Sequence, residues 1–335
     1  MIARWLAAID AWQRRRPSTA FPFAVVKKFG DDHAGHLAAL VAYYSFFSIF
    51  PLLLVLTTIL GRVLESRPDL RDDLLDSALA QFPVIGDQLR DSTGSIPGSG
   101  LALVIGIVGA IWGGMGAMMA MQNALNGVWN VPYTERPNMV KGRVRALVML
   151  GLFGLGIVGL TAASSVAGLV GDIGVLGDVT SLAVAFALGV GLFLCAFRVL
   201  TDAPTTWGDV LPGAVAAALA WSVLQVLGGA FVQHVVANAS STAGVFAVVI
   251  GLLSWLYLVA QLTVLSAEIN VVRREGLWPR SMTGRDLGEG DKRALARYAA
   301  AERRVEGQEV VIDLRPPAVQ HWVRTSSTGR TDDES

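Results

Sequence analysis

One glutamate inside an apolar stretch is the residue of this sequence with the clearest capacity for chemistry. Ser254, Gln261 and Glu268 recur every seven residues, so a helix places them on one stripe. An ionisable side chain within a membrane-spanning segment is a candidate for substrate or proton binding. The alternative is an ion pair of Glu268 with the arginines at 273–274, with Arg198 or with the basic second loop. Both interpretations stay open.

Amide side chains extend this set of candidates. Asn123 and Asn126 share one helical face near the end of the second apolar run, and Asn270 follows Glu268 by two residues. These amides either line a vestibule on a substrate path or hydrogen-bond neighbouring helices. Such an interhelical bond is worth about 0.6 kcal/mol on average in membranes.

Pro51 lies inside the first apolar run and predicts a kink, because proline cannot donate to the carbonyl of Phe47. Ser48 precedes it by about one turn and could satisfy a freed carbonyl, and Tyr43 and Tyr44 come before that. One interpretation is a broken helix that faces a polar cavity. The other is a packing kink next to an interfacial belt of aromatic residues.

The fourth polar segment is predicted to act as a structural hinge. Arg198 and Asp209 bracket it and are expected to pair, while Pro212 fits the first turn of the following helix. Gly213 completes this hinge. Arg198 could also bind an anionic headgroup.

A metal site and a cofactor are not expected. Asp31, Asp32, His33 and His36 carry metal-ligating side chains, but a hydrolytic metal needs several convergent ligands and an open position. A lead-in helix to the first apolar run explains them better. The sequence has no P-loop, and no residue is assigned a catalytic role.

These candidates have to be positioned by helices that cross a membrane. Hydrophobic residues make up 53% of the chain, charged residues 16%, and the mean hydropathy is +0.51. A spanning helix needs about 20 apolar residues. Six stretches qualify and predict an all-α, polytopic membrane bundle, at about residues 37–60, 101–125, 144–170, 182–200, 210–235 and 245–272.

Basic residues predict the orientation of the bundle. Lysine and arginine collect in the N-terminal segment, the second loop at 136–145, the fourth loop and the C-terminal end, which six crossings place on one side. Basic loops stay in the cytoplasm. We therefore expect a multi-pass protein of the bacterial inner (plasma) membrane with both termini in the cytoplasm.

Three further segments flank or interrupt the membrane domain. Residues 1–36 form a cytoplasmic, interfacial segment in which 2–12 predict a helix, followed by arginines rather than preceded by them as in a signal peptide. Residues 68–89 predict an amphipathic helix in the first outer loop. Residues 273–335 predict a cytoplasmic tail that is largely disordered, with one helix over 291–305.

Several motifs resemble those of the YihY/BrkB family of bacterial inner-membrane proteins. The first apolar run, His36-Leu-Ala-Ala-Leu-Val-Ala-Tyr-Tyr-Ser-Phe-Phe-Ser-Ile-Phe-Pro-Leu-Leu-Leu54, resembles the family signature. Trp207-Gly-Asp-Val-Leu-Pro-Gly-Ala214 and Ala267-Glu-Ile-Asn270 resemble later family motifs. The resemblance implies the fold and the location. Members carry an old ribonuclease BN label or a virulence-factor label, and a role in moving envelope lipids has been suggested.

Two functions remain in competition at this point. One is a transporter or flippase-like protein for an envelope lipid, an amphiphile or a small solute, and the other is a non-transporting scaffold for the envelope. A nuclease is not expected, because the net charge is zero and no basic groove is visible. Membrane lipids are the expected partners, a homo-oligomer is left open, and nucleic acid is not expected to bind.

Overall fold

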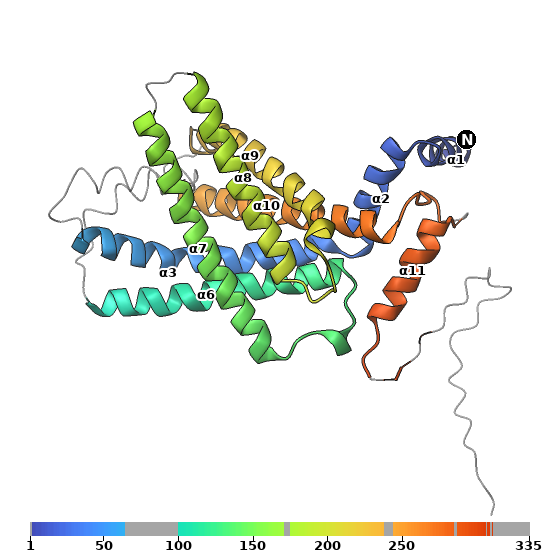
Figure 1. The fold of residues 1–335 in the computed structure, drawn as a ribbon, viewed down its shortest axis with the longest axis horizontal. Helices are drawn as coiled ribbons and strands as arrows, with labels where there is room; N and C mark the ends of the chain where they lie inside the picture. The colour runs from blue at the N-terminus through green and yellow to red at the C-terminus, as the bar shows by residue number, and fades with distance from the viewer. Residues whose placement is uncertain are drawn as a thin grey trace, which may run out of the picture.

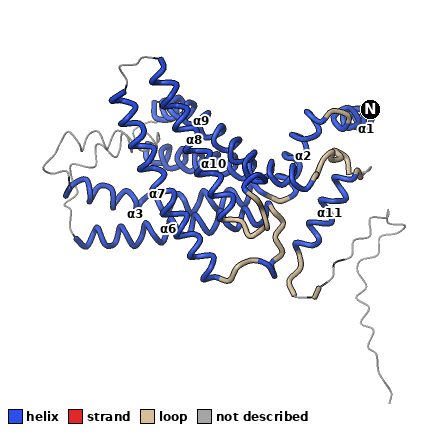
Figure 2. Tube along the Cα trace, in the orientation of Figure 1, coloured by secondary structure: helices blue, strands red, loops and turns tan. Residues whose placement is uncertain are grey.

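The computed structural model describes residues 2–63, 100–170, 175–237, 244–284, 287–305, 307–308 and 310, and every regular element in these ranges is a helix (Figure 2). In chain order the helices are α1 (Ile2–Arg14), α2 (Pro17–Asp31), α3 (Ala34–Val63), α6 (Gly100–Val128), the short 3₁₀ helix η1 (Tyr133–Glu135), α7 (Met139–Val170), α8 (Val175–Val199), α9 (Trp207–Ala237), α10 (Gly244–Glu275) and α11 (Glu289–Ala301). The all-α expectation is confirmed for the described residues.

Among the described residues, five helices are long and apolar enough to cross a membrane. The qualifying segments are Ala34–Val55, Leu103–Val128, Leu182–Val199, Trp207–Gly228 and Val249–Glu275. Each overlaps one of the runs expected from the sequence. The remaining expected run, 144–170, lies in α7, whose 32 residues at about 1.5 Å each exceed a hydrocarbon layer of about 30 Å.

The six long helices form a closed ring. Along the chain α3 packs on α6, α6 on α7, α7 on α8, α8 on α9 and α9 on α10, and α10 returns to pack on α3. Helices α3 and α6 have the most extensive contact and run side by side in Figure 1. Large apolar side chains such as Trp112, Val226 and Phe246 stay 73–80% exposed on the outside of this ring. That pattern is expected where lipid is the solvent.

Glycines let α3 and α6 approach closely. A Cβ on Gly113 would lie 2.8 Å from Cα of Ser48, and a Cβ on Gly109 would lie 2.9 Å from Cβ of Pro51. Both distances are shorter than a carbon–carbon contact allows. In a membrane, helices associate largely through such close packing, because lipid supplies no hydrophobic drive. The Gly109–Gly113 pair is therefore a packing motif between these two helices.

Pro51 and Pro212 both lie inside helices. Helix α3 continues through Pro51, and the Ser48 hydroxyl donates to the carbonyl of Ser45 over 2.7 Å rather than to that of Phe47. Helix α9 already begins at Trp207, so Pro212 lies one turn deeper in the helix than expected. The expectation placed the start of this helix too late, because the polar residues before 210 do not look like part of an apolar run.

The N-terminal helices α1 and α2 and the described part of the C-terminal segment, with α11, lie at one end of the bundle (Figure 1). The helix expected over 291–305 is present as α11, which begins at Glu289 and ends at Ala301, and the segment from 276 to 284 hydrogen-bonds to α1 and α2. The disorder expected for the rest of the tail stays a prediction. The amphipathic helix expected over 68–89 lies outside the described residues.

We predict that Gly113→Ala destabilises the protein although alanine favours helices. The added methyl would overlap the backbone of Ser48, and overpacking typically costs about 1–3 kcal/mol. Thermal unfolding of the detergent-solubilised protein, followed by circular dichroism, measures the effect. Gly151→Ala in α7 is the control, because a Cβ there meets nothing within 4 Å. Equal unfolding temperatures for the two variants would contradict the packing role of Gly113.

Candidate functional site

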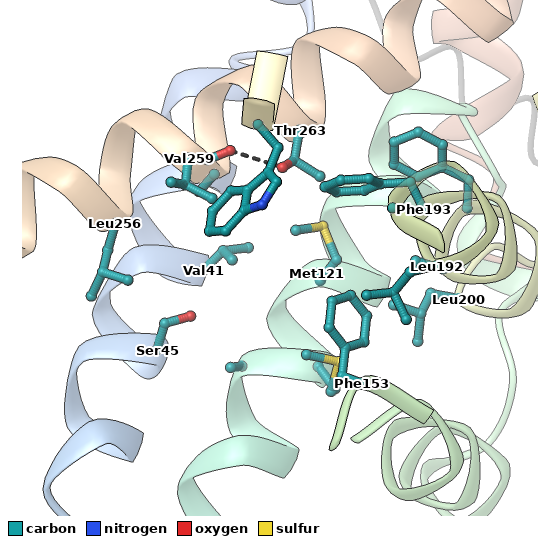
Figure 3. Close-up of a pocket in the computed structure, with 17 residues that line it drawn as sticks. Val41, Ser45, Met121, Phe153, Leu192, Phe193, Leu200, Leu256, Val259 and Thr263 are labelled. Carbon is teal, nitrogen blue, oxygen red and sulfur yellow. Dashed lines mark hydrogen bonds between the residues drawn. The ribbon is translucent and has the colours of Figure 1, made fainter. Parts of the chain in front are cut away.

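An apolar cavity lies inside the ring of helices. Its volume is about 270 Å³, and all six long helices contribute to its wall. The lining includes Val41 and Ser45 of α3, Met121 of α6, Phe153 of α7, Leu192 and Phe193 of α8, Trp221 of α9, and Leu256, Val259 and Thr263 of α10 (Figure 3). Leu200, just after α8, also lines it.

The wall of this cavity offers almost no hydrogen bonds to an occupant. The Thr263 hydroxyl donates a hydrogen bond to the carbonyl of Val259, 2.8 Å away in its own helix (Figure 3). Ser45 and the Trp221 indole are the other polar side chains of the wall. An apolar cavity of this kind excludes water and accepts hydrocarbon. The chemistry of the cavity therefore fits an acyl chain or another apolar group.

The sequence-predicted tyrosines and Ser48 lie close to the cavity on α3, but the cavity wall is made by Val41 and Ser45 instead. Tyr43 is 52% exposed and packs edge-on against Tyr44. Tyr44 in turn covers Gly116 of α6. This arrangement agrees with the packing interpretation of these residues.

Asn126 holds the polar end of the bundle together through an acid that the sequence analysis missed. Its amide donates to Oδ2 of Asp202 over 2.7 Å, and its carbonyl oxygen accepts the Asp202 backbone N–H over 2.8 Å. Arg145 of α7 pairs with the same carboxylate. Asp202 therefore joins α6, α7 and the loop after α8. Asn123 is exposed and accepts a hydrogen bond from Arg136 over 2.9 Å.

Asn270 fixes the contact between α9 and α10. Its Oδ1 accepts the backbone N–H of Gly213 over 2.6 Å, and a Cβ at Gly213 would overlap the carbonyl oxygen of Ser266. This position needs glycine because the two backbones touch.

The predicted pair between Arg198 and Asp209 is absent from the described part of the chain. Asp209 instead accepts hydrogen bonds from Thr206 at the start of α9 and lies 3.4 Å from Arg274. Arg274 also donates to the carbonyl of Pro204 over 2.6 Å. The segment between α8 and α9 is thereby fastened to the end of α10.

Glu268 is fully buried, and its ion pair is with a lysine that was not among the expected partners. Lys28 of α2 lies with Nζ 3.1 Å from Oε2 of Glu268, and it also binds the Asp32 carboxylate. Gln261 lies on the same side of α10, where it faces Gly35 at the start of α3. The predicted stripe on α10 thus faces α2 and α3, on a different side of the helix from the cavity residues Val259 and Thr263.

Asp291 organises the described part of the tail. Its carboxylate accepts hydrogen bonds from Arg280 Nε and from the N–H of Ser281, both over 2.8 Å, and from the N–H of Gly288 over 3.1 Å. Lys27 of α2 lies 3.3 Å away. Burial opposes ionisation, but the hydrogen bonds from Arg280 and Ser281 and the charge of Lys27 outweigh it and hold the pKa of Asp291 below its usual range.

The residues that the sequence analysis overlooked share one property. Lys28, Asp202 and Asp291 are charged residues in polar stretches, and each pairs with an element distant in the chain. Local composition carries no signal for such partners. Within the described ranges, no group of three or more histidine, cysteine or acidic residues is arranged to hold a metal ion.

The fold and the cavity define a class: a multi-pass membrane protein whose helices close a ring around an apolar space. Residues 25–284 match the family described as Virulence factor BrkB, and the chain belongs to this family. The resemblance seen in the sequence motifs is thereby confirmed.

Two relatives span most of the chain. The ribonuclease-like protein YfkH of Bacillus subtilis (strain 168) is 25% identical over 244 residues, which cover 70% of this chain and 88% of YfkH. An uncharacterized protein of Dickeya dadantii (strain 3937) is 24% identical over 287 residues, which cover 79% of this chain and 85% of the relative. No solved structure matches this chain.

We expect Asp202→Ala to loosen the junction of α6 and α7. The substitution leaves Asn126 and Arg145 without their common acceptor, and such a loss costs about 1–3 kcal/mol. A double-mutant cycle with Asn126→Ala, read by thermal unfolding, should show that the two effects do not add. Asn123→Ala, on the exposed side of the same helix, should have little effect. If the effects of Asp202→Ala and Asn126→Ala on the unfolding temperature were strictly additive, the proposed role of Asp202 in this junction would be refuted.

Asp291→Asn should release residues 276–301 from α1 and α2. Because the folded-state pKa of Asp291 is lowered, its contribution is complete above the ordinary aspartate value of about 3.9 and disappears as pH falls through the folded value. Hydrogen exchange of α11 in the full-length protein measures the release. In wild type, protection of α11 should fall in acid, whereas Asp291→Asn should be unprotected already at neutral pH. Glu289→Gln, an exposed neighbour, should keep wild-type protection.

Proposed function

We propose that this chain is a six-span protein of the bacterial inner membrane that moves an envelope lipid or another amphiphile by accepting its hydrocarbon part in the central cavity. The observation that carries this proposal is the apolar wall of the cavity, to which all six long helices contribute. A site that suits acyl chains and lies among spanning helices supports a transporter or flippase-like activity. A polar solute suits this wall poorly, because it would lose its hydrogen bonds to water.

The distribution of charge supports the proposed orientation. Basic residues lie at the end of the bundle where α2 ends, α7 begins and α10 ends, as with Lys28, Arg145 and Arg274. Basic segments remain on the cytoplasmic side. With six crossings, both termini then lie in the cytoplasm, and α7 is the third crossing.

Helix α1 supports an interfacial position of the N-terminus. Trp5 and Trp12 are 68% and 52% exposed on this helix, and Arg15 and Arg16 follow at its end. Exposed tryptophans next to arginines are typical of a helix that lies in the headgroup region.

A scaffold without transport is the second candidate, and one observation favours it. Asn126, Asn270 and Glu268 contact neighbouring elements and do not line the cavity. The polar residues thus have structural partners. The cavity, however, has no role in a scaffold.

The name of YfkH is not extended to this chain. We expect no ribonuclease activity, because the sequence has zero net charge and offers neither a basic groove nor convergent metal ligands.

Lipid movement can be measured in liposomes that contain the purified full-length protein and a trace of fluorescent phospholipid. A membrane-impermeant reductant bleaches the outer leaflet only, so further loss of fluorescence reports lipid that has crossed. In liposomes that contain the wild-type protein, we expect the reductant to bleach the lipid of both leaflets. Val259→Trp should slow the second phase by about tenfold or more, because the indole fills the cavity and overpacking costs about 1–3 kcal/mol.

Val226→Trp is the matched control, because Val226 is 80% exposed on the outside of α9. It should bleach like wild type. If wild-type liposomes bleach like protein-free liposomes, the transport proposal fails and the scaffold gains support. If Val259→Trp is as active as wild type, the cavity is not the path.

A further inference from the structure

A buried lysine at the end of α2 gathers the ends of three helices. The Lys28 ammonium is fully buried, donates to the carbonyl of Val128 at the end of α6 over 2.6 Å and binds the Asp32 carboxylate. Its third contact is Oε2 of Glu268 on α10, 3.1 Å away. An ammonium has three N–H donors. Two of them serve Val128 and Asp32, and the contact with Glu268 is an ion pair without a hydrogen bond of good geometry.

The charges around this ammonium do not balance. The carboxylates of Asp32 and Glu268 share the one cation, and their side chains are 3% and 0% exposed. Within the described residues, neither oxygen of Glu268 receives a hydrogen bond of good geometry. An uncompensated carboxylate without donors is strongly disfavoured in a medium of low dielectric constant. The site is thus short of one positive charge next to Glu268.

Helix α11 does not supply that charge through Arg297, which pairs with Glu275 over 2.7 Å. The ring of Tyr298 lies 6.0 Å from Nζ of Lys28. Burial, followed by the negative charges of Asp32 and Asp31, raises the pKa of Tyr298 above its usual range. The phenol is therefore neutral.

The other elements around Glu268 do not supply it either. Arg280, in the segment before α11, pairs with Asp31 and Asp291, each over 2.8 Å. Helix α6 has no ionisable residue between 100 and 128, and His36 at the start of α3 is exposed. On α9, Asp209 is occupied by Arg274.

We infer that Glu268, Asp32 and Lys28 form a buried binding site for a single proton, which is carried by Glu268 and shared with the Asp32 carboxylate. With the proton bound, one ammonium faces one carboxylate and one carboxylic acid, and the net charge is zero. The carboxyl oxygens of Glu268, which otherwise receive no hydrogen bond, then carry an O–H donor of their own. Two neighbouring carboxylates in a dry site commonly share a proton in this way.

The bound proton has a consequence for stability with a defined sign. The folded protein holds a proton that the unfolded chain releases above the ordinary glutamate value of about 4.3, so the free energy of unfolding falls as pH rises above that value. The fall ends where the folded site loses its proton. This inference does not depend on lipid movement, because it concerns only the occupancy of the site.

Infrared difference spectroscopy of the full-length protein in lipid tests the site directly. Near pH 7 wild type should show the carbonyl stretching band of a protonated carboxylic acid, and the band should disappear reversibly as pH is raised. Glu268→Gln should lack the band. Glu275→Gln, on the same helix but paired with Arg297 at the surface, should keep it.

The Asp32→Asn variant distinguishes a proton-binding site from a carboxyl group with a structural role alone. Glu268 is still present in this variant, but one carboxylate now faces one ammonium, so the band should be lost near pH 7. Persistence of the band in Asp32→Asn would overturn the inference. Helix content by circular dichroism and elution from a sizing column establish that each variant is folded.

Thermal unfolding of the same proteins gives an independent measure. The unfolding temperature of wild type should fall as pH rises from about 5 to about 8, above the ordinary carboxyl range, and the slope should flatten in Glu268→Gln. The inference would be overturned if wild type and Glu268→Gln showed equal slopes of unfolding temperature against pH and wild type showed no acid band. The inference would also be overturned if wild type showed no acid band and sodium ions stabilised wild type but not Glu268→Gln. A metal ion would then supply the charge.

Discussion

An ammonium buried among helix ends has no water to solvate it, and the contacts that replace water determine how this bundle is assembled. Lys28 is held by Val128 of α6, by Asp32 just after its own helix and by Glu268 of α10. The lysine can be buried only when all three elements are in place. The same constraint applies to the other buried polar groups at this end, which is why the N-terminal helices and the described part of the tail are joined to the ring rather than free.

The apolar part of the ring is held by a different interaction. Lipid does not drive apolar helices together, so close backbone contact has to do so, and Gly109 and Gly113 provide it between α3 and α6. Between α6 and α8, in contrast, larger side chains such as Met121 and Phe193 line a space that they do not fill, and the cavity results. Tight packing on one side of the ring and a cavity inside it are therefore compatible within one bundle.

The sequence predicts the helices well because hydropathy is a local property, and α3, α6, α8, α9 and α10 each overlap an expected run. It does not predict partners. Arg274 is close to Glu268 in sequence, yet it binds Asp209, while Lys28 reaches Glu268 from the other end of the chain. In the tail, the helix over 291–305 is expected from the sequence, but the pairs that Arg280 and Asp291 make with Asp31 and Lys27 of α2 are not. Tertiary pairing of single charges leaves no pattern in one sequence.

Helix α10 connects the two sites of this molecule. Val259 and Thr263 point toward the cavity, whereas Gln261 and Glu268 lie on the side that faces α2 and α3, as the 3.6-residue period requires. The helix also packs on α9 and α6. Because a continuous helix moves as a rigid element, a change in the charge of the Glu268 cluster that shifted α10 against α2 would also shift the cavity wall. Helix α10 thus connects the polar end of the bundle, at Glu268, to its apolar centre, at Val259 and Thr263.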